Sequence, residues 1–195
     1  MPITTVILAG GKGTRIGGNK GLQLLHGKAL IDWVLDAIRS QSDEILINAN
    51  ANTNDYAKRG YRIIIDHSPE HAGPLAGLQA ALLCAQHEWV ACVPCDTPAL
   101  PDNLITRLRS AITPTTEAVV AVAGGQRQST ISLHHKDVVR KLDAYLDSGA
   151  RKVGDWLNTL RVSEVVFEDA AAFANINSLE ELAMANQRRE IPDPR

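Results

Sequence analysis

Aromatic residues, cysteines and long apolar segments are scarce in this chain of 195 residues. Phe, Trp and Tyr together make up 4% of it, and no apolar run approaches the roughly 20 residues that a transmembrane helix needs. No basic segment precedes the first apolar run, residues 4–9, so we expect no export signal. The formal net charge of −2 excludes a chain-wide surface for nucleic acid or membrane. We therefore predict a cytoplasmic protein that binds neither nucleic acid nor membranes and whose anion-binding sites are local.

The three cysteines, at positions 84, 92 and 95, are an odd number, which does not favour a disulfide framework. Two of them form a CxxC motif, CVPC, for which a redox pair and a zinc site are alternatives. A thioredoxin-type pair begins a helix, whereas this motif ends an apolar run and is followed by Asp96. A zinc site needs further paired ligands, which the histidines of the chain do not supply at a recognisable spacing. We therefore favour thiols that pack beside Asp96.

Short apolar segments typical of buried strands alternate with helical patterns along most of the chain. The strand segments are residues 4–9, 44–49, 62–65, 89–93, 118–122 and 162–167, and the helical patterns are residues 30–41, 74–86 and 101–112. This alternation predicts an α/β fold, a single-domain, doubly wound, mainly parallel sheet that binds ligands at the carboxyl ends of its strands. We predict a domain over residues 1–188 and a disordered tail over residues 189–195, which hold two prolines and four charges.

A glycine-rich loop follows the first strand segment directly. Residues 10–21, GGKGTRIGGNKG, contain six glycines and three cations, Lys12, Arg15 and Lys20. Glycines allow backbone N–H groups to approach a ligand closely, and the cations add positive charge. The loop therefore predicts a site for a triphosphate, with a flexible glycine-rich hairpin as the alternative.

The spacing within this loop does not fit two other phosphate-binding motifs. In a Walker A motif the lysine follows the last glycine directly, whereas here Asn19 separates Gly18 from Lys20. The dinucleotide-binding fingerprint requires a third glycine at the position of Ile16. Neither a P-loop NTPase nor a dinucleotide-binding domain is supported.

The stretch LAGGKGTRIGGNKG, residues 8–21, resembles the signature loop of nucleotidyltransferases that join a nucleoside monophosphate to a phosphorylated partner and release pyrophosphate. Four further stretches, NANANTNDY, DHSPEHAGPLAGL, VPCDTPALP and FANINSLEEL, follow strand-like runs. Together with the loop they resemble the molybdenum cofactor guanylyltransferase family over residues 3–187. The resemblance implies a Rossmann-like nucleotidyltransferase fold and Mg²⁺-dependent transfer of GMP from GTP to molybdenum-molybdopterin. It also implies contacts with other molybdenum-cofactor pathway proteins and with apo-molybdoenzymes.

The same resemblance implies roles for individual residues, with a GTP-binding N-terminal half and an acceptor-binding C-terminal half. The catalytic residues are Arg15, Lys20 and Asp96, of which Asp96 is the metal ligand. The nucleotide-binding residues are Leu8, Ala9, Gly10, Gly11, Lys20, Asn48, Asp66, Gly77 and Asp96. The acceptor-binding residues are Arg127, Asn175 and Asn177.

Each of these residues also has a structural interpretation. A hard carboxylate such as Asp96 suits Mg²⁺ that bridges phosphates, but it can also accept hydrogen bonds within a turn. Asn48 can pair with a purine edge or a ribose, yet asparagine is also favoured where strands end. Contact with ribose or guanine and helix capping are both open for Asp66. Gly77, in AGPLAGL, allows either N–H contact with the nucleotide or a tight helix–sheet contact.

The C-terminal half offers weaker signals. Ser178 and Glu181 form the pattern of a capping box that opens the last helix. Arg127, Arg151 and Lys152 can bind the phosphate of the acceptor, or they can belong to a solvated face, and the sequence favours neither.

Two departures from the family pattern bear on base choice. Relatives often have a second arginine where Thr14 stands and an acidic residue where Asn19 stands. CTP as donor and a sugar phosphate as acceptor are therefore alternatives within the same chemistry. A non-catalytic adaptor that delivers the cofactor is a third alternative, against which Lys20 and Asp96 argue.

Overall fold

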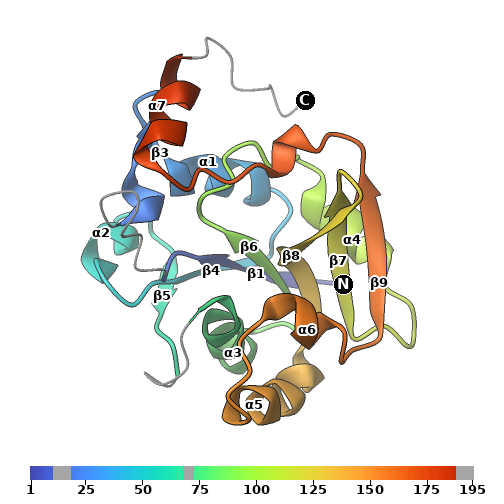
Figure 1. Ribbon diagram of the computed structural model, residues 1–195. Helices are drawn as coiled ribbons and strands as arrows, with labels where there is room; N and C mark the ends of the chain where they lie inside the picture. Colours follow the sequence, from blue (N-terminus) through green and yellow to red (C-terminus); the bar gives the residue numbers. More distant parts are fainter. Residues whose placement is uncertain (11–18, 68–72, 188–195) are drawn as a thin grey trace.

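The computed structural model describes residues 1–10, 19–67 and 73–187, and its centre is a seven-stranded sheet (Figure 1). The strand order is β5-β4-β1-β6-β8-β7-β9. Four of the six neighbouring pairs are parallel, and β8 runs antiparallel to both β6 and β7. The strands are β1 (Ile3–Leu8), β4 (Glu44–Asn48), β5 (Arg62–Ile64), β6 (Trp89–Pro94), β7 (Ala118–Ala123), β8 (Gln126–His135) and β9 (Val162–Phe167). The prediction of a doubly wound, mainly parallel α/β fold is confirmed.

Strand β8 is the one strand of the seven-stranded sheet that the apolar pattern did not predict. Its first half, QRQST, is polar, so it does not read as a buried strand. The two glycines before it, Gly124 and Gly125, could have indicated this strand. Both have positive φ, 58° and 74°. Two consecutive residues of this kind form the tight turn that joins antiparallel strands in a hairpin.

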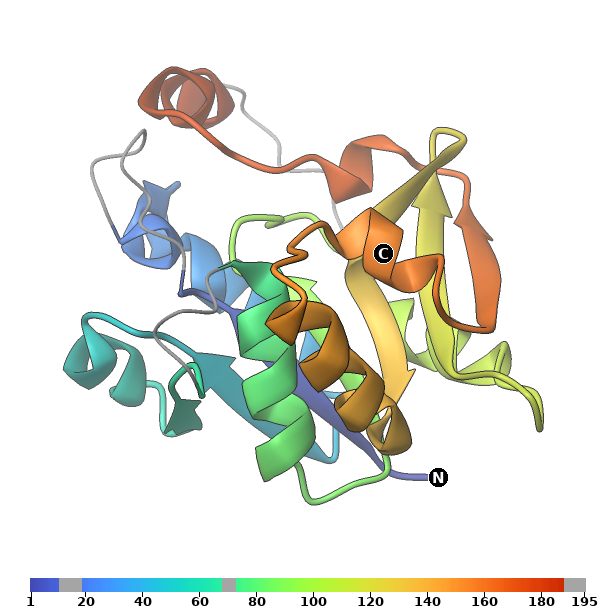
Figure 2. The ribbon, with the colours of Figure 1, turned by 60° about the horizontal axis from the view of Figure 1, so that its bottom comes forward.

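Helices cover both faces of the sheet. One face packs against α1 (Leu30–Ile38) and α4 (Leu104–Ser110), and the other against α3 (Pro74–Cys84), α5 (Val139–Asp147) and α6 (Val153–Leu157). Figure 2 shows α3 and α5 side by side on the same face. The helices expected at 30–41, 74–86 and 101–112 are present but shorter than predicted. The remaining elements are η2 (Lys20–Leu22), β2 (Leu24–Leu25), β3 (Lys28–Ala29), α2 (Thr53–Ala57), η3 (Lys136–Val138), η4 (Ala171–Phe173) and α7 (Leu179–Gln187).

Alternate residues of β1, β4, β6 and β7 enter two separate hydrophobic clusters, as the two-residue period of a strand requires. In β6, Cys92 packs with Val90 in the cluster beneath α3, whereas Cys95 belongs to the cluster beneath α1. The two thiols therefore lie on opposite faces of the sheet, and both are free and buried. Burial raises the pKa of each to about 12. The CxxC motif is thus a pair of packing residues, and the redox and zinc alternatives find no support.

The C-terminal helix returns to the beginning of the chain. Helix α7 packs on the β2–β3 hairpin, and together they enclose a small apolar cluster that includes Leu25, Ile176 and Leu182. Asn186 of α7 accepts a hydrogen bond from the backbone N–H of His26 at 2.7 Å. Across residues 1–10, 19–67 and 73–187, no helix has the length and apolar character needed to cross a bilayer.

Candidate active site

Most of the expected site residues lie where β1, β4 and β6 end, and we call this end of the strands the carboxyl edge of the sheet. The paired strands place Leu8 beside Asn48 and Pro94, and the backbone N–H of Ala9 donates to the Asn48 carbonyl at 2.8 Å. Asp96 follows β6 by two residues. Gly11 and Arg15, which were expected to bind the nucleotide, lie outside the described residues, as does the predicted tail at 189–195.

Lys20 and Asp96 form an ion pair at this edge. Their side chains are only 19% and 10% exposed. Gly21 allows the contact, because a Cβ at this position would lie 3.2 Å from the Cβ and Sγ atoms of Cys95. The short helix η2 can therefore lie directly on the loop that carries Asp96, and Cys95 packs beside Asp96 as the sequence predicted.

Asp96 uses only one of its carboxylate oxygens within the described part of the chain. Oδ2 contacts Lys20, whereas Oδ1 is buried and has no hydrogen-bond partner among the described residues. A buried carboxylate oxygen without a partner is costly, so a ligand that satisfies it is favoured. The described residues contain no group of three or more His, Cys, Asp or Glu side chains that would form a protein-only metal cage. The arrangement fits Mg²⁺, which usually takes one or two carboxylates and completes its shell with phosphate oxygens and water.

The segment before α7 is tied to this same loop. The backbone N–H of Ile176 donates to the Asp96 carbonyl at 2.9 Å, and Thr97 Oγ1 donates to Asn175 Oδ1 at 2.6 Å. Lys20 Nζ donates to Asn177 Oδ1 at 2.8 Å. Asn175 and Asn177, expected to bind the acceptor, therefore also hold residues of the nucleotide side.

The predicted capping box at the start of α7 is present. The backbone N–H of Glu181 donates to Ser178 Oγ at 3.1 Å. The Glu181 carboxylate in turn accepts from the backbone N–H of Asn177 at 2.5 Å, one residue before the Ser178 N–H of an ideal box. The helix start thus fixes the backbone that presents Asn177 to Lys20.

A second polar network joins the loops after β4 and β5. Asn48 is 3% exposed, and its amide donates to Asp66 Oδ1 at 2.9 Å. Asn50 donates to Asp66 Oδ2 at 2.7 Å and accepts from the Asp66 backbone N–H at 2.9 Å. The sequence analysis did not include Asn50 among the site residues. The sequence NAN, residues 48–50, could have indicated that Asn50 lies beside Asn48, because residues i and i+2 project to the same side of an extended chain.

Gly77 has a clear packing role in this network. A Cβ at Gly77 would lie 2.4 Å from Asn48 Oδ1 and 2.7 Å from Leu8 Cδ2, which is too close for any side chain. Of the two interpretations of AGPLAGL, the tight helix–sheet contact is therefore observed. Contact between Gly77 and a nucleotide stays a prediction.

The basic residues expected near the acceptor have partners within the chain. Arg127 Nε donates to Glu164 at 2.6 Å, and its Nη1 donates to Asn158 at 2.9 Å. Arg151 donates to the backbone carbonyls of Leu146 and Ala150 at 2.6 and 2.7 Å. These contacts explain both residues without a ligand, so the assignment of Arg127 to the acceptor site stays a prediction that they do not support.

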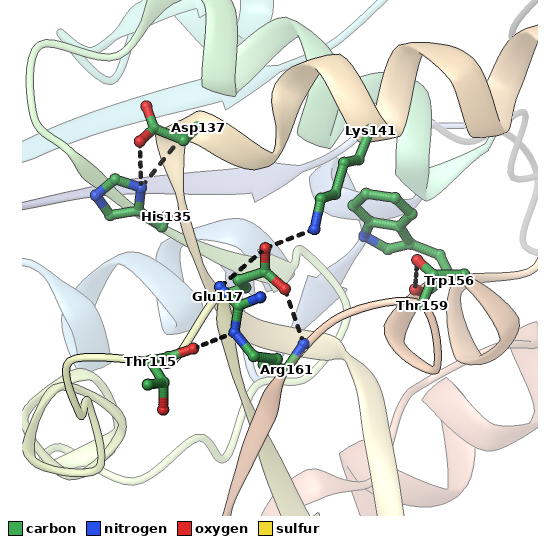
Figure 3. Close-up of polar contacts among 8 residues, drawn as sticks. All are labelled: Thr115, Glu117, His135, Asp137, Lys141, Trp156, Thr159 and Arg161. Carbon is green, nitrogen blue, oxygen red and sulfur yellow. Dashed lines mark hydrogen bonds and ion pairs between the residues drawn. The ribbon is translucent and has the colours of Figure 1, made fainter.

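The other end of the sheet, formed by the start of β7 and the end of β8, carries its own charged cluster (Figure 3). Glu117 and Arg161 of this cluster line a cavity of about 440 Å³. Glu117, 14% exposed, accepts from Lys141 Nζ at 2.6 Å, contacts Arg161 Nη2 at 3.3 Å and accepts from the Arg161 backbone N–H at 3.0 Å. Burial raises the pKa of Glu117, but the hydrogen bonds from Lys141 and the Arg161 backbone outweigh it, so its pKa lies below its ordinary value. Both carboxylate oxygens are satisfied within the chain.

The chain is similar to known proteins over most of its length. A family model described as a MobA-like NTP transferase domain matches residues 5–162. The molybdenum cofactor guanylyltransferase of Cupriavidus metallidurans is 44% identical over 190 residues, which are 93% of each chain. That of Vibrio vulnificus is 41% identical over 184 residues, 93% of this chain and 94% of the relative.

Solved structures share the fold. The molybdopterin-guanine dinucleotide biosynthesis protein A of Archaeoglobus fulgidus superposes with a TM-score of 0.79 at 22% identity, covering 94% of this chain and 97% of the other. A nucleotidyl transferase of Methanothermobacter thermautotroptrophicus superposes with a TM-score of 0.77 at 19% identity, covering 95% and 96% of the two chains. At these identities the likeness concerns the fold alone.

Proposed function

This chain belongs to the MobA-like NTP transferase family, and from that premise we propose that it transfers GMP from GTP to molybdenum-molybdopterin. A phosphate oxygen of the acceptor forms a bond to the α-phosphorus of GTP. The bond from the α-phosphorus to the oxygen that bridges to the β-phosphorus breaks, and pyrophosphate leaves with that electron pair. The Lys20–Asp96 pair carries the proposal, because it places a cation and an incompletely satisfied buried carboxylate at the edge where ligands of such sheets bind.

The nucleotide lies across the carboxyl ends of β1, β4 and β6 in this proposal. The backbone at Leu8, Ala9, Gly10 and Gly11 approaches the nucleotide, and Arg15 and Lys20 neutralise its phosphates. Charge builds up on the leaving pyrophosphate, so fixed cations lower the barrier by stabilising it. Lys20 is held in place before the nucleotide arrives by Asp96 and Asn177.

Asp96 would hold Mg²⁺ through its unpartnered Oδ1. When bound, Mg²⁺ supplies positive charge that offsets the phosphates and helps to orient them. The acceptor phosphate is already nucleophilic at neutral pH, so we assign no general base. Positioning and charge stabilisation account for the rate.

Base recognition falls to the network after β4 and β5. The Asp66 carboxylate only accepts hydrogen bonds, and the N1 and N2 groups of guanine are donors, so a carboxylate suits guanine better than adenine or cytosine. Asn48 holds that carboxylate from a buried position. Asn175, Asn177 and Arg127 form the proposed acceptor side.

The remaining parts of the proposal concern cellular context. We place the protein in the cytoplasm, where GTP and molybdopterin are available to it. One nucleotidyltransferase domain over residues 1–188 performs the reaction, and other molybdenum-cofactor pathway proteins and apo-molybdoenzymes are its protein partners.

The test is a mass-spectrometric product assay with purified protein, Mg²⁺, molybdenum-molybdopterin and GTP, CTP or ATP in separate reactions. We expect a guanine dinucleotide from GTP alone and no product from the Asp96→Ala variant. Asp102→Ala, which alters an exposed aspartate of the same loop region, is the matched control and keeps activity.

Other results would contradict specific parts of the proposal. Product from CTP would show that the base assignment is wrong and that Thr14 and Asn19 mark a different specificity. If no nucleotide gives a dinucleotide, molybdopterin is not the acceptor, and sugar phosphates should be screened with the same nucleotides. Full activity of Asp96→Ala would remove the metal-binding role of that residue.

A further inference from the structure

We infer that Asn50 is a positioning residue for the nucleotide base, and that it acts through Asp66. The inference rests on the proposed function, because it takes Asp66 as the residue that faces the nucleotide. Asn50 itself is not expected to contact the base.

The contacts of Asn50 with Asp66 are reciprocal. The Asn50 amide N–H donates to Asp66 Oδ2 at 2.7 Å, and the Asn50 amide oxygen accepts from the Asp66 backbone N–H at 2.9 Å. The Asn50 side chain therefore hydrogen-bonds both the backbone and the carboxylate of Asp66. Rotation of the Asp66 side chain would break the first bond, and displacement of its backbone would break the second.

Asn48 completes the restraint from the other side. Its amide donates to Asp66 Oδ1 at 2.9 Å, so each carboxylate oxygen of Asp66 accepts one amide hydrogen. A carboxylate has about four lone-pair positions, so both oxygens keep acceptor capacity for a ligand in a fixed direction. Asn48 is buried, whereas Asn50 and Asp66 lie nearer the solvent at the edge where the nucleotide is proposed to bind. Without Asn50, the carboxylate would be held through one oxygen only.

The network also touches the start of the glycine-rich loop. A Cβ at Gly10 would lie 3.0 Å from Asn50 Nδ2 and 3.1 Å from Asn48 Oδ1. The backbone that begins the phosphate-binding loop therefore packs against the two amides that orient Asp66. A carboxylate that is already oriented binds a nucleotide with less ordering cost than a mobile one would.

The test is a double-mutant cycle on the dissociation constant for GTP, with Asn50→Ala, Asp66→Ala and the double variant. If Asn50 acts through Asp66, we expect Asn50→Ala to weaken GTP binding about tenfold in the natural background and less than about twofold in the Asp66→Ala background. Equal losses in both backgrounds would overturn the inference, because they would mean that Asn50 contacts the nucleotide directly. No loss in either background would overturn it as well.

Steady-state kinetics provide a second measurement. A residue that only stabilises the fold would not change KM for GTP while leaving kcat unchanged. We expect Asn50→Ala to raise KM for GTP about tenfold and to leave kcat within about twofold, because the interaction is the same in the ground and transition states. Asn50→Asp replaces the donor with an anionic oxygen that faces Asp66 Oδ2, so its loss should exceed that of Asn50→Ala. Binding by Asn50→Asp as tight as in the natural protein would contradict the inference.

Asn54→Ala, at an exposed asparagine of α2, is the matched control and should leave GTP binding unchanged. The product assay separates this inference from the proposed function. Natural protein that forms the dinucleotide from GTP, together with an Asn50→Ala variant that binds GTP as tightly, overturns the role of Asn50 alone. Natural protein that neither binds GTP nor forms the product overturns both.

Discussion

At the carboxyl edge of the sheet, Asp96 contacts one cation, Lys20, and leaves its buried Oδ1 without a partner among the described residues. At the other end of the sheet, Glu117 satisfies both carboxylate oxygens with Lys141 and Arg161. Both are largely buried acidic side chains that meet basic ones, so charge and burial alone do not separate them. What differs is whether the hydrogen bonds are completed within the chain. A charged cluster whose hydrogen bonds are all made within the chain stabilises the fold. A cluster with an unpaired polar atom can bind a ligand there.

The largest expected effect comes from removing the charge at the incomplete edge. Asp96→Asn keeps the shape of the side chain but loses the anionic oxygen, and we expect kcat/KM for GTP to fall about 1000-fold or more. The melting temperature should change little, because the variant loses the ion pair with Lys20 but also loses the cost of a buried anionic oxygen without a partner. A combined turnover assay and thermal melt would check both. An active variant, or one that unfolds more easily, would contradict the assignment of Asp96 to function.

His134 is a third buried side chain with an unpaired polar atom, and it tests whether such an atom always indicates a functional site. It is buried in β8, its Nε2 lies 2.9 Å from Ser132 Oγ, and its Nδ1 has no partner among the described residues. Burial lowers the pKa of His134 to about 4. This group is also incomplete, yet it lies in the interior of the sheet packing rather than at the proposed site, so it should affect stability and not catalysis.

The sign of the pH effect follows from proton uptake. Unfolded chains bind a proton at His134 near the ordinary pKa of about 6.5, whereas the folded state does so only near 4. Between these values the unfolded state holds more protons, so the free energy of unfolding decreases as the pH falls from 6.5 to 4. The full difference is about 3 kcal/mol. Below pH 4 this group adds no further loss.

Urea unfolding at a series of pH values would measure that slope. We expect His134→Gln to reduce the slope between pH 6.5 and 4, whatever its effect on absolute stability. The same slope in His134→Gln as in the natural protein would show that other groups cause the acid sensitivity.

A substitution of Glu117 should reduce stability and leave turnover unchanged, which is the reverse of what we expect for Asp96. Glu117→Gln removes the charge that Lys141 and Arg161 neutralise, and we expect the free energy of unfolding to fall by about 1–2 kcal/mol, since both cations are half or more exposed and partly screened. Turnover should stay within about twofold. Glu168→Gln, whose side chain is 85% exposed in its pair with Arg107, is the control and should change stability little. A large loss of turnover in Glu117→Gln would mean that the two ends of the sheet do not divide function from stability.

Local sequence patterns were enough for the fold class and for part of the site. Apolar runs and helical periodicity predicted six of the seven strands of the sheet and helices α1, α3 and α4, but not α2, α5 or α6. The capping box at Ser178 and Glu181 is present. Strand β8 was missed because its polar first half hides the period, although Gly124 and Gly125 marked the hairpin turn.

Other contacts of the site lay beyond local patterns. Lys20 and Asn177 are 157 positions apart, and only the folding of α7 back onto the β2–β3 hairpin brings them together. The role of Asn50 likewise depends on Asp66, 16 positions away, and on the parallel pairing of β4 with β5. Hydrogen bonds of this kind follow from topology, which a single sequence does not display.

The smallest expected effect distinguishes two ways in which the C-terminal segment supports the incomplete edge. Asn177→Ala removes the neutral acceptor of Lys20 but keeps its contact with Asp96, so we expect kcat/KM for GTP to fall about fivefold to tenfold with little change in melting temperature. Ser178→Ala is the matched control, because it removes the helix cap and should cost about 1 kcal/mol of stability while turnover stays within about twofold. Equal losses of turnover in both variants would indicate that the anchoring of α7 matters, and not the contact with Lys20. A loss confined to Asn177→Ala would place Asn177 among the groups that hold Lys20 ready for the nucleotide.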